Sequence, residues 1–182
     1  EAGWVYGEGE SVRSKNGQKL KLSLVYDASI AGNSQVGEHL KAQYEAVGIQ
    51  LDLVPQETPD WNESWRTGQF DLLLSRTWGI PYEPYGSFFC MASPGDKFYL
   101  VQSGMSGKQE LDVIMKDTLG QNDGERMKED MAYIMERLHH EAVYVPLTAV
   151  ADLAVYREGL SGSDMNSARG GLGIGSMRPL EP

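Results

Sequence analysis

The sequence predicts an α/β fold built around parallel strands. Residues 19–27 and 49–55 alternate apolar and polar side chains, as half-buried strands do. The segment between them has helical spacing, so the two strands form a βαβ unit and should be parallel. A second helical segment and a third apolar run, residues 69–78, repeat the pattern.

The first strand places apolar side chains on one face, and the Asn16-Gly17 pair before it predicts a tight hairpin turn. That face consists of Leu20, Leu22, Leu24 and Tyr26. In the helix that follows, we expect Ser34 to be the N-cap and Gly48 to stop the helix. The apolar face of this helix consists of Val36, Leu40, Tyr44 and Val47.

The second helix has boundary signals of its own, with Thr58 as the expected N-cap, Pro59 in the first turn and Gly68 at the end. The run over residues 69–78 is apolar almost without interruption up to Arg76. Apolar residues on both faces are typical of a strand that helices cover on both sides. We therefore expect this run to be a central strand.

The second half of the chain predicts mainly helices. A short helix should follow Pro84, and amphipathic helices are expected within residues 108–119 and 125–142. Residues 144–157 then predict one or two strands because β-branched and aromatic residues are frequent there.

Length and composition fit one compact domain over residues 1–160, followed by a Gly- and Ser-rich return segment or tail over residues 161–182. The formal net charge of −10 argues against nucleic acid as a partner. The lone cysteine, Cys90, stands among apolar residues and is expected to be a buried small hydrophobe. The opening EAGW fits the end of a helix that Gly3 stops, so we expect the chain to be a piece of a longer one.

The sequence does not contain the hydrolase and phosphate-binding motifs GxSxG, HExxH or Walker A. We therefore expect a protein that is not an enzyme and needs no cofactor, and a hydrolase is kept only as a third possibility. His139 and His140 are neighbours on a helix and point about 100° apart, which suits chelation of one ion poorly. We interpret them as the solvated end of a helix, where positive charge complements the helix dipole.

The segment with the strongest functional signal follows the third strand and reads RTWGIPYEPYGSFF, residues 76–89. In open α/β sheets, ligands bind beyond the carboxyl ends of the strands. Arg76 can hold a carboxylate through two hydrogen bonds. The rings of Trp78, Tyr82 and Tyr85 offer rigid faces for packing or cation–π contact. The same residues also fit an aromatic core cluster under a loop, and both interpretations stay open on composition alone.

Two segments resemble the family 5 extracellular solute-binding proteins, which bind dipeptides, oligopeptides or nickel complexes. FDLLLSRTWGIPYEP is similar to a family segment in which a Phe-Asp pair precedes a Trp, a Tyr and an acid–Pro pair. Its RTWG-P-Y pattern and the later LHHEAVYVPL resemble the nickel-binding branch of the family. The resemblance covers most of residues 1–160 and is to the second lobe of these proteins.

The resemblance implies the second lobe of a type II periplasmic-binding-protein fold, in which helices flank a mixed, mostly parallel sheet. It implies the substrate-binding component of an ABC importer, expected to be a monomer, that captures a small ligand between two lobes and delivers it to a membrane permease. The ligand would be a nickel–chelator complex or, alternatively, a dipeptide or oligopeptide. The protein would be periplasmic, or extracellular and lipid-anchored in a Gram-positive host.

By position, the resemblance makes Trp78 and Tyr82 the residues that face the ligand, and Arg76 matches the same motif. Nickel would arrive inside its chelator and would not be a cofactor. Some nickel binders offer a His on the loop after the motif, whereas the corresponding loop here reads SPGDKF. Asp96 in that loop is the acid that could ligate a metal directly, and the alternative is an exposed turn residue.

Overall fold

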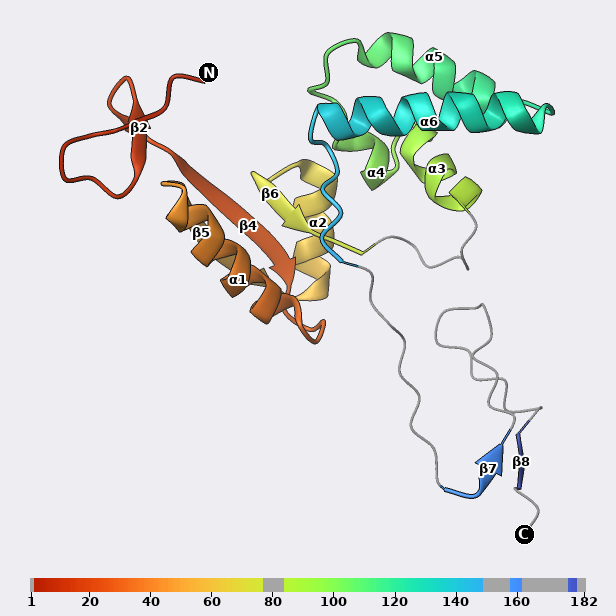
Figure 1. Cartoon of the computed structure of the whole chain (residues 1–182), viewed down its shortest axis with the longest axis horizontal. Coiled ribbons are helices and arrows are strands. Elements are labelled where there is room, and N and C mark those ends of the chain that lie inside the picture. The colour runs from red at the N-terminus through yellow and green to blue at the C-terminus, as the bar shows by residue number, and fades with distance from the viewer. Residues whose placement is uncertain (1, 77–83, 149–157, 162–176, 180–182) are drawn as a thin grey trace. The chain divides into compact units, whose positions relative to one another are not determined.

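The computed structural model describes residues 2–76, 84–148, 158–161 and 177–179 (Figure 1). The chain divides into two compact units, Glu1–Arg76 and Thr77–Pro182. The expected division at residue 160 stays a prediction. None of the helices in the described ranges combines the length and the apolar character needed to cross a membrane.

The first unit contains a three-stranded sheet in the order β5-β4-β6, and its strands are β4 (Lys21–Asp27), β5 (Gln50–Gln56) and β6 (Leu72–Leu74). Both pairs in this sheet are parallel. The predicted βαβ unit is therefore confirmed.

The prediction that the run 69–78 is a central strand is not supported by this sheet. Within the described residues β4 is the central strand, and β6 pairs with it over three residues at one edge. The leucines of β6 are half-buried. In contrast, Leu24, Val25 and Tyr26 of β4 are buried in succession, because this strand is covered on both faces.

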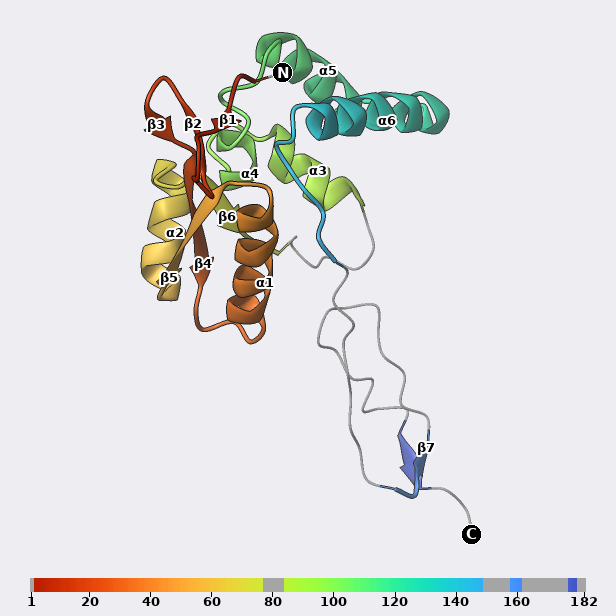
Figure 2. The same cartoon turned by 60° about the vertical axis from the view of Figure 1, so that its left-hand side comes forward.

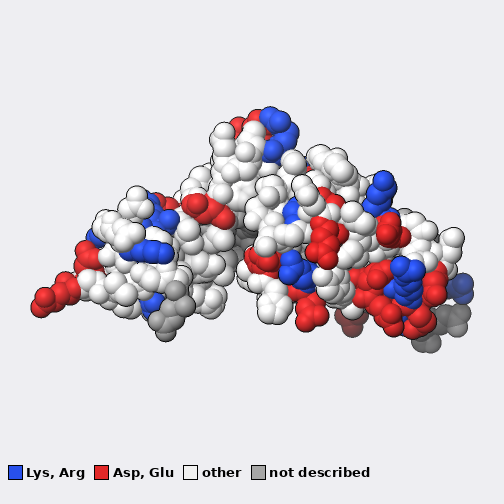
Figure 3. Space-filling model, turned by 90° about the horizontal axis from the view of Figure 1, so that it is seen from above, with Lys and Arg blue, Asp and Glu red and all other residues white. Residues whose placement is uncertain are grey.

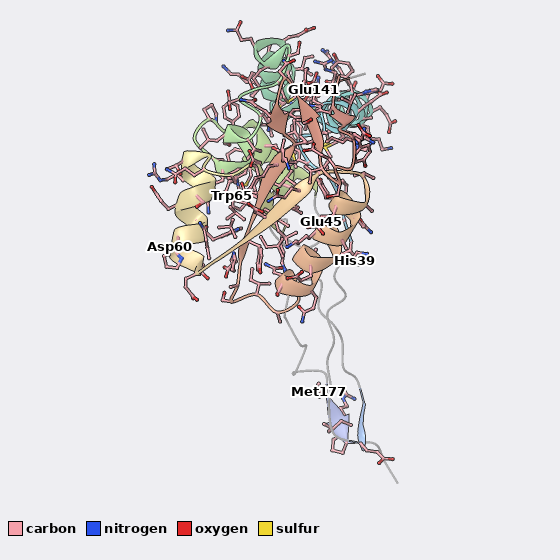
Figure 4. All side chains as sticks on the ribbon, turned by 90° about the vertical axis from the view of Figure 1, so that its left-hand side faces the viewer. His39, Glu45, Asp60, Trp65, Glu141 and Met177 are labelled. Carbon is pink, nitrogen blue, oxygen red and sulfur yellow. The ribbon has the colours of Figure 1, made fainter. Side chains whose placement is uncertain are left out.

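Two helices cover the sheet: α1 (Asn33–Ala46) and α2 (Thr58–Thr67). They lie on opposite faces of the strands (Figure 2). Figure 4 shows His39 and Glu45 on the α1 side of the sheet and Asp60 and Trp65 on the α2 side. Trp65 is 5% exposed and packs edge-on against Trp61, one turn earlier, with ring centroids 5.1 Å apart.

The two predicted N-caps are wrong. Gly32, in the left-handed conformation, precedes α1 without a side-chain cap, so Ser34 lies inside the helix. Glu57 occupies the N-cap position of α2 in an extended conformation. The hydroxyl of Thr58 donates instead to Asp27 Oδ2 at 2.8 Å, and this long-range bond replaces the expected cap.

Three of the four residues predicted for the apolar face of α1 are half-buried, and the prediction is wrong only at the fourth. Val47, expected on the apolar face, directly follows the helix and is 52% exposed, whereas Asn33 and Gly37 are buried. A methyl group at Gly37 would lie 3.5 Å from the side chains of Leu53 and Tyr26. Such a methyl group would make ordinary van der Waals contact, so the helix packs on the sheet here at a normal distance.

A short antiparallel ribbon precedes the sheet and consists of β1 (Val5–Tyr6), β2 (Arg13–Lys15) and β3 (Gln18–Lys19). The predicted hairpin turn at Asn16-Gly17 is confirmed, since both residues have positive φ, 52° and 79°. Two consecutive residues with positive φ are the requirement of the tight turn that joins twisted strands.

Gly48→Ala should destabilise the chain more than Gly68→Ala. Both glycines follow helices with positive φ, 80° and 71°, which confirms the predicted helix ends. An alanine at either position therefore lowers the stability by about 1–2 kcal/mol, because an L residue is strained in the left-handed conformation. A methyl group at Gly48 would also lie 2.5 Å from the ring of Tyr6, whereas Gly68 has open space around it.

We expect the free energy of unfolding of Gly48→Ala to fall below that of Gly68→Ala by at least about 1 kcal/mol, because the tyrosine must move. Urea denaturation of both variants measures this difference. Equal losses would show that the Tyr6 ring moves aside without cost.

The described part of the second unit contains four helices and one short strand pair. The helices are α3 (Pro84–Ala92), α4 (Lys97–Leu100), α5 (Lys108–Leu119) and α6 (Gly124–His140), and the strands are β7 (Leu160–Ser161) and β8 (Arg178–Pro179). The predicted helices are thus confirmed. Their core consists of Phe88, Met91, Phe98, Met105, Leu111, Met115, Ile134 and Leu138.

The segment after α6 differs from the prediction in its described part. Residues 144–148 are not in a strand, and the rest of the expected strand region, 149–157, lies outside the described residues. The hydroxyl of Tyr144 donates to the carbonyl of Phe98, and Gln102 donates to that hydroxyl at 3.0 Å. Burial, partly offset by the bond from Gln102, raises the pKa of Tyr144 to about 12. Tyr144 is therefore anchored to the helices by its side chain, whereas residues 145–148 are exposed.

Candidate functional site

The order of the strands marks the carboxyl end of the sheet in the first unit as a place for a ligand. From β4 the chain passes through α1 to β5 on one side, and from β5 it passes through α2 back to β6 on the other side. In parallel sheets, a ligand binds outside the carboxyl ends of the strands where the chain direction reverses in this way. Here that point lies between β4, which ends at Asp27, and β6, which Arg76 follows closely.

Arg76 reaches across this point. Its side chain is exposed, and its Nη2 donates to the carbonyl of Ala31 at 3.3 Å. Ala31 belongs to the loop between β4 and α1, so the arginine connects the ends of two neighbouring strands. Among the described residues, no carboxylate pairs with Arg76. No described carboxylate occupies its other guanidinium N–H groups, so these can donate to an anionic ligand.

A buried carboxylate organises the same edge. Asp27 is 2% exposed, and its Oδ1 accepts hydrogen bonds from the amide and the hydroxyl of Ser29 at 2.9 and 2.6 Å. Its Oδ2 accepts from the hydroxyl of Thr58 at 2.8 Å. The backbone carbonyl of Asp27 accepts from the side-chain amide of Asn33 at 3.0 Å. This cluster joins the end of β4 to the first turns of both helices.

The charge state of Asp27 follows from these contacts. Burial by itself raises the pKa of the carboxyl group, but the hydrogen bonds from Ser29 and Thr58 outweigh it and lower the pKa below its usual value. Asp27 is therefore a carboxylate at neutral pH. This cluster is not among the predicted site residues, although an Asp at the end of a strand with Ser two residues later is a recognisable turn signal.

The predicted site residues are only partly visible. Arg76 lies at the expected edge of the sheet, whereas Trp78 and Tyr82 lie outside the described residues. Tyr85 belongs to the first turn of α3, and only its backbone is described. A ligand-binding role for these four residues stays a prediction.

Asp96, the candidate metal-binding acid, caps a helix. Its carboxylate accepts from the amide of Phe98 at 2.8 Å at the start of α4, and the residue is half-buried. It also lies close to Cys90, whose thiol pKa is raised first by burial and then by the charge of Asp96. Cys90 is half-buried, less than predicted, and is held in its unreactive thiol form. In the described part of the chain, no three His, Cys, Asp or Glu residues come together as a metal site.

Two of the three histidines lie where the sequence predicts. His139 and His140 are exposed in the last turn of α6. His39 is exposed on α1, and its Nε2 lies 3.0 Å from the side-chain amide of Gln43.

Figure 3 shows Lys and Arg on one face as separate spots between uncharged surface and Asp and Glu side chains. Nucleic-acid binding requires a continuous basic patch. The described residues of that face do not form one.

Comparison with solved structures shows that the fold is a lobe of the type II periplasmic-binding-protein class. The oligopeptide-binding protein AppA from Bacillus subtilis, solved in complex with a nonapeptide, shares this fold at a TM-score of 0.69 and 18% identity, over 99% of this chain and 36% of AppA. NikA from Brucella suis, solved in complex with Fe(III)-EDTA, matches at a TM-score of 0.90 and 29% identity, over 98% of this chain and 36% of NikA.

The nickel-binding periplasmic protein of Escherichia coli K12 is 26% identical over 181 residues, which are 100% of this chain and 34% of that protein. No family model matches the chain. These comparisons confirm the resemblance to solute-binding proteins and to their nickel-binding branch. The chain spans about a third of the length of these relatives.

Proposed function

We propose that the chain is the second lobe of the substrate-binding component of an ABC importer and that the complete protein captures a nickel–chelator complex between two lobes. The observation that carries this proposal is the similarity over the whole chain to the nickel-binding protein of E. coli and to NikA. Nickel is then cargo inside its chelator, and the protein is a binder with neither a cofactor nor an enzymatic activity.

Arg76 is the residue that links this proposal to the described structure. The chelator in the NikA complex, EDTA, is a polycarboxylate. A guanidinium at the carboxyl edge of a parallel sheet suits such a ligand, because it binds carboxylates through two parallel hydrogen bonds. In the proposed site, Trp78, Tyr82 and Tyr85 pack their rings against the complex and shield it from water.

The second candidate is a dipeptide or oligopeptide ligand. The shared fold with AppA and its nonapeptide favours this alternative. The carboxyl terminus of a peptide presents Arg76 with the same group as a chelator does. The nickel proposal has the stronger support because NikA matches with both higher identity and higher TM-score.

The proposal includes the partner and the location. The binding protein acts as a monomer that delivers its ligand to an ABC permease in the membrane. It is periplasmic, or extracellular and lipid-anchored in a Gram-positive host. The relative from E. coli is described as periplasmic, which supports the first location.

Calorimetry on the full-length protein tests the ligand. Nickel with L-histidine should bind with a Kd of about 1 μM or tighter, whereas a panel of dipeptides and oligopeptides should give no heat of binding. Tight peptide binding without a response to nickel and histidine would replace the first candidate by the second. The 182-residue chain serves as the matched control. It should bind at least about tenfold more weakly, because it offers one side of the cleft.

A further inference from the structure

We propose that Asp27 is a positioning residue, which fixes the loop between β4 and α1 so that the Ala31 carbonyl holds Arg76 ready for the ligand. This inference rests on the proposed function, because it assigns the group that prepares the same site. Asp27 itself is 2% exposed and does not need to touch the ligand.

The loop is fixed on both sides of Ala31. On one side, the amide and the hydroxyl of Ser29 donate to the carboxylate of Asp27. On the other side, the side-chain amide of Asn33 donates to the carbonyl of Asp27, and the backbone amide of Asn33 donates to the carbonyl of Ile30 at 3.2 Å. Asp27 accepts three of these four bonds and so holds the loop on both sides of the Ala31 carbonyl.

A second helix contributes to the same cluster. Thr58, the first residue of α2, donates to Asp27 Oδ2 and lies 3.1 Å from the hydroxyl of Ser29. The backbone amide of Ala28 donates to the carbonyl of Gln56 at the end of β5 at 2.9 Å. The loop is thus anchored to α2 and β5 as well as to its own strand.

Arg76 needs an external anchor. Its side chain is long and exposed, and it donates a hydrogen bond to the Ala31 carbonyl. A free arginine side chain loses rotamer entropy when it binds a ligand, and a side chain that is already oriented loses less. The Asp27 cluster therefore acts on affinity through Arg76.

The test compares two serines that make the same contact at opposite ends of β4. Ser29 donates through its amide and hydroxyl to Asp27, and Ser23 does so to Asp71 at 2.8 Å for both bonds. Ser29→Ala and Ser23→Ala each remove one serine–aspartate bond, and Ser29→Ala should lower the thermal midpoint of the full-length protein more, because Asp27 is buried and Asp71 is exposed. For nickel with L-histidine, Ser29→Ala should weaken binding about fivefold, whereas Ser23→Ala should leave the Kd unchanged.

A double-mutant cycle shows whether the effect passes through Arg76. In an Arg76→Ala background, Ser29→Ala should weaken binding no further, although it should still lower the thermal midpoint. Thr58→Val provides a second variant of the cluster, and Thr67→Val is its control, because Thr67 donates to the carbonyl of Glu63 at the other end of α2.

Three outcomes would overturn the inference. Equal affinities of Ser29→Ala and Ser23→Ala would show that the cluster only stabilises the fold. A loss of affinity that persists in the Arg76→Ala background would show that it acts by another route. If the unmodified full-length protein bound neither nickel with L-histidine nor peptides, the proposed function itself would fail and the inference would fall with it.

Discussion

Asp27→Asn should lower the free energy of unfolding of the chain by about 2–3 kcal/mol at neutral pH. Asparagine has nearly the same shape, but it is uncharged and replaces one acceptor oxygen by an NH2 donor. The carboxylate of Asp27 accepts three hydrogen bonds, from the amide and hydroxyl of Ser29 and from the hydroxyl of Thr58. In the variant, a donor would face one of these donors inside a buried cluster.

Urea denaturation at pH 7 measures the loss, and Asp71→Asn is the matched control. Asp71 also accepts from the amide and hydroxyl of a serine, Ser23, but it is exposed, so water can replace the lost bonds. We expect a clearly smaller loss in the control. Equal losses would mean that the burial of Asp27 adds nothing to its contribution.

The effect of Asp27 should depend on pH in a definite direction. The pKa of Asp27 is lowered in the folded chain, so its contribution to stability is complete above the unfolded pKa of about 3.9. It is lost as the pH falls through the lower folded pKa. The difference in stability between the parent chain and Asp27→Asn should therefore be constant above about pH 5 and shrink below about pH 4. A difference that grows in acid would contradict the lowered pKa.

Trp78→Ala in the full-length protein should weaken the binding of nickel with L-histidine by about thirtyfold, which corresponds to about 2 kcal/mol. Aromatic side chains at the centre of a binding site commonly contribute this much, because they bury a large rigid surface. The thermal midpoint without ligand should stay within about 2 °C of the parent, since in the proposed site the Trp78 ring faces the ligand rather than the core.

Trp65→Ala is the contrasting control. Trp65 is 5% exposed between α2 and the sheet, so its removal should reduce the free energy of unfolding by about 3–5 kcal/mol. A similar loss of stability in Trp78→Ala would instead identify the rings after β6 as an aromatic core cluster. That result would leave the proposed function without its central contact.

Local features of this chain could be predicted well from the sequence. The Asn16-Gly17 turn, the helix ends at Gly48 and Gly68, and the strands β4 and β5 depend on nearby residues and on periodicity. The order of the strands could not be predicted in the same way. Residues 72–74 appear central by composition, but the position of a strand in a sheet depends on which partners pair with it, and those are distant in the chain.

The site shows the same limit. Arg76 could be placed at the carboxyl end of the sheet because it follows an apolar run that predicts a strand. The Asp27 cluster could not be foreseen, because Thr58 bonds to a residue 31 positions earlier rather than to its own helix. A threonine hydroxyl at a helix start can bond to its own helix or to a residue distant in the chain. Tertiary contacts decide between the two, and helix-start statistics describe only the first.

The Gly48 position also bears on how the first unit unfolds. The ribbon β1–β3 consists of strands of two or three residues, which are too short to persist alone in water. Its Tyr6 ring occupies the space left by the missing side chain of Gly48, and Arg13, whose guanidinium lies 4.8 Å from that ring, donates its backbone amide to the Gly48 carbonyl at 2.8 Å. The ribbon therefore depends on its contacts with the turn between α1 and β5 to stay folded. We therefore expect the ribbon to open to solvent whenever this turn opens.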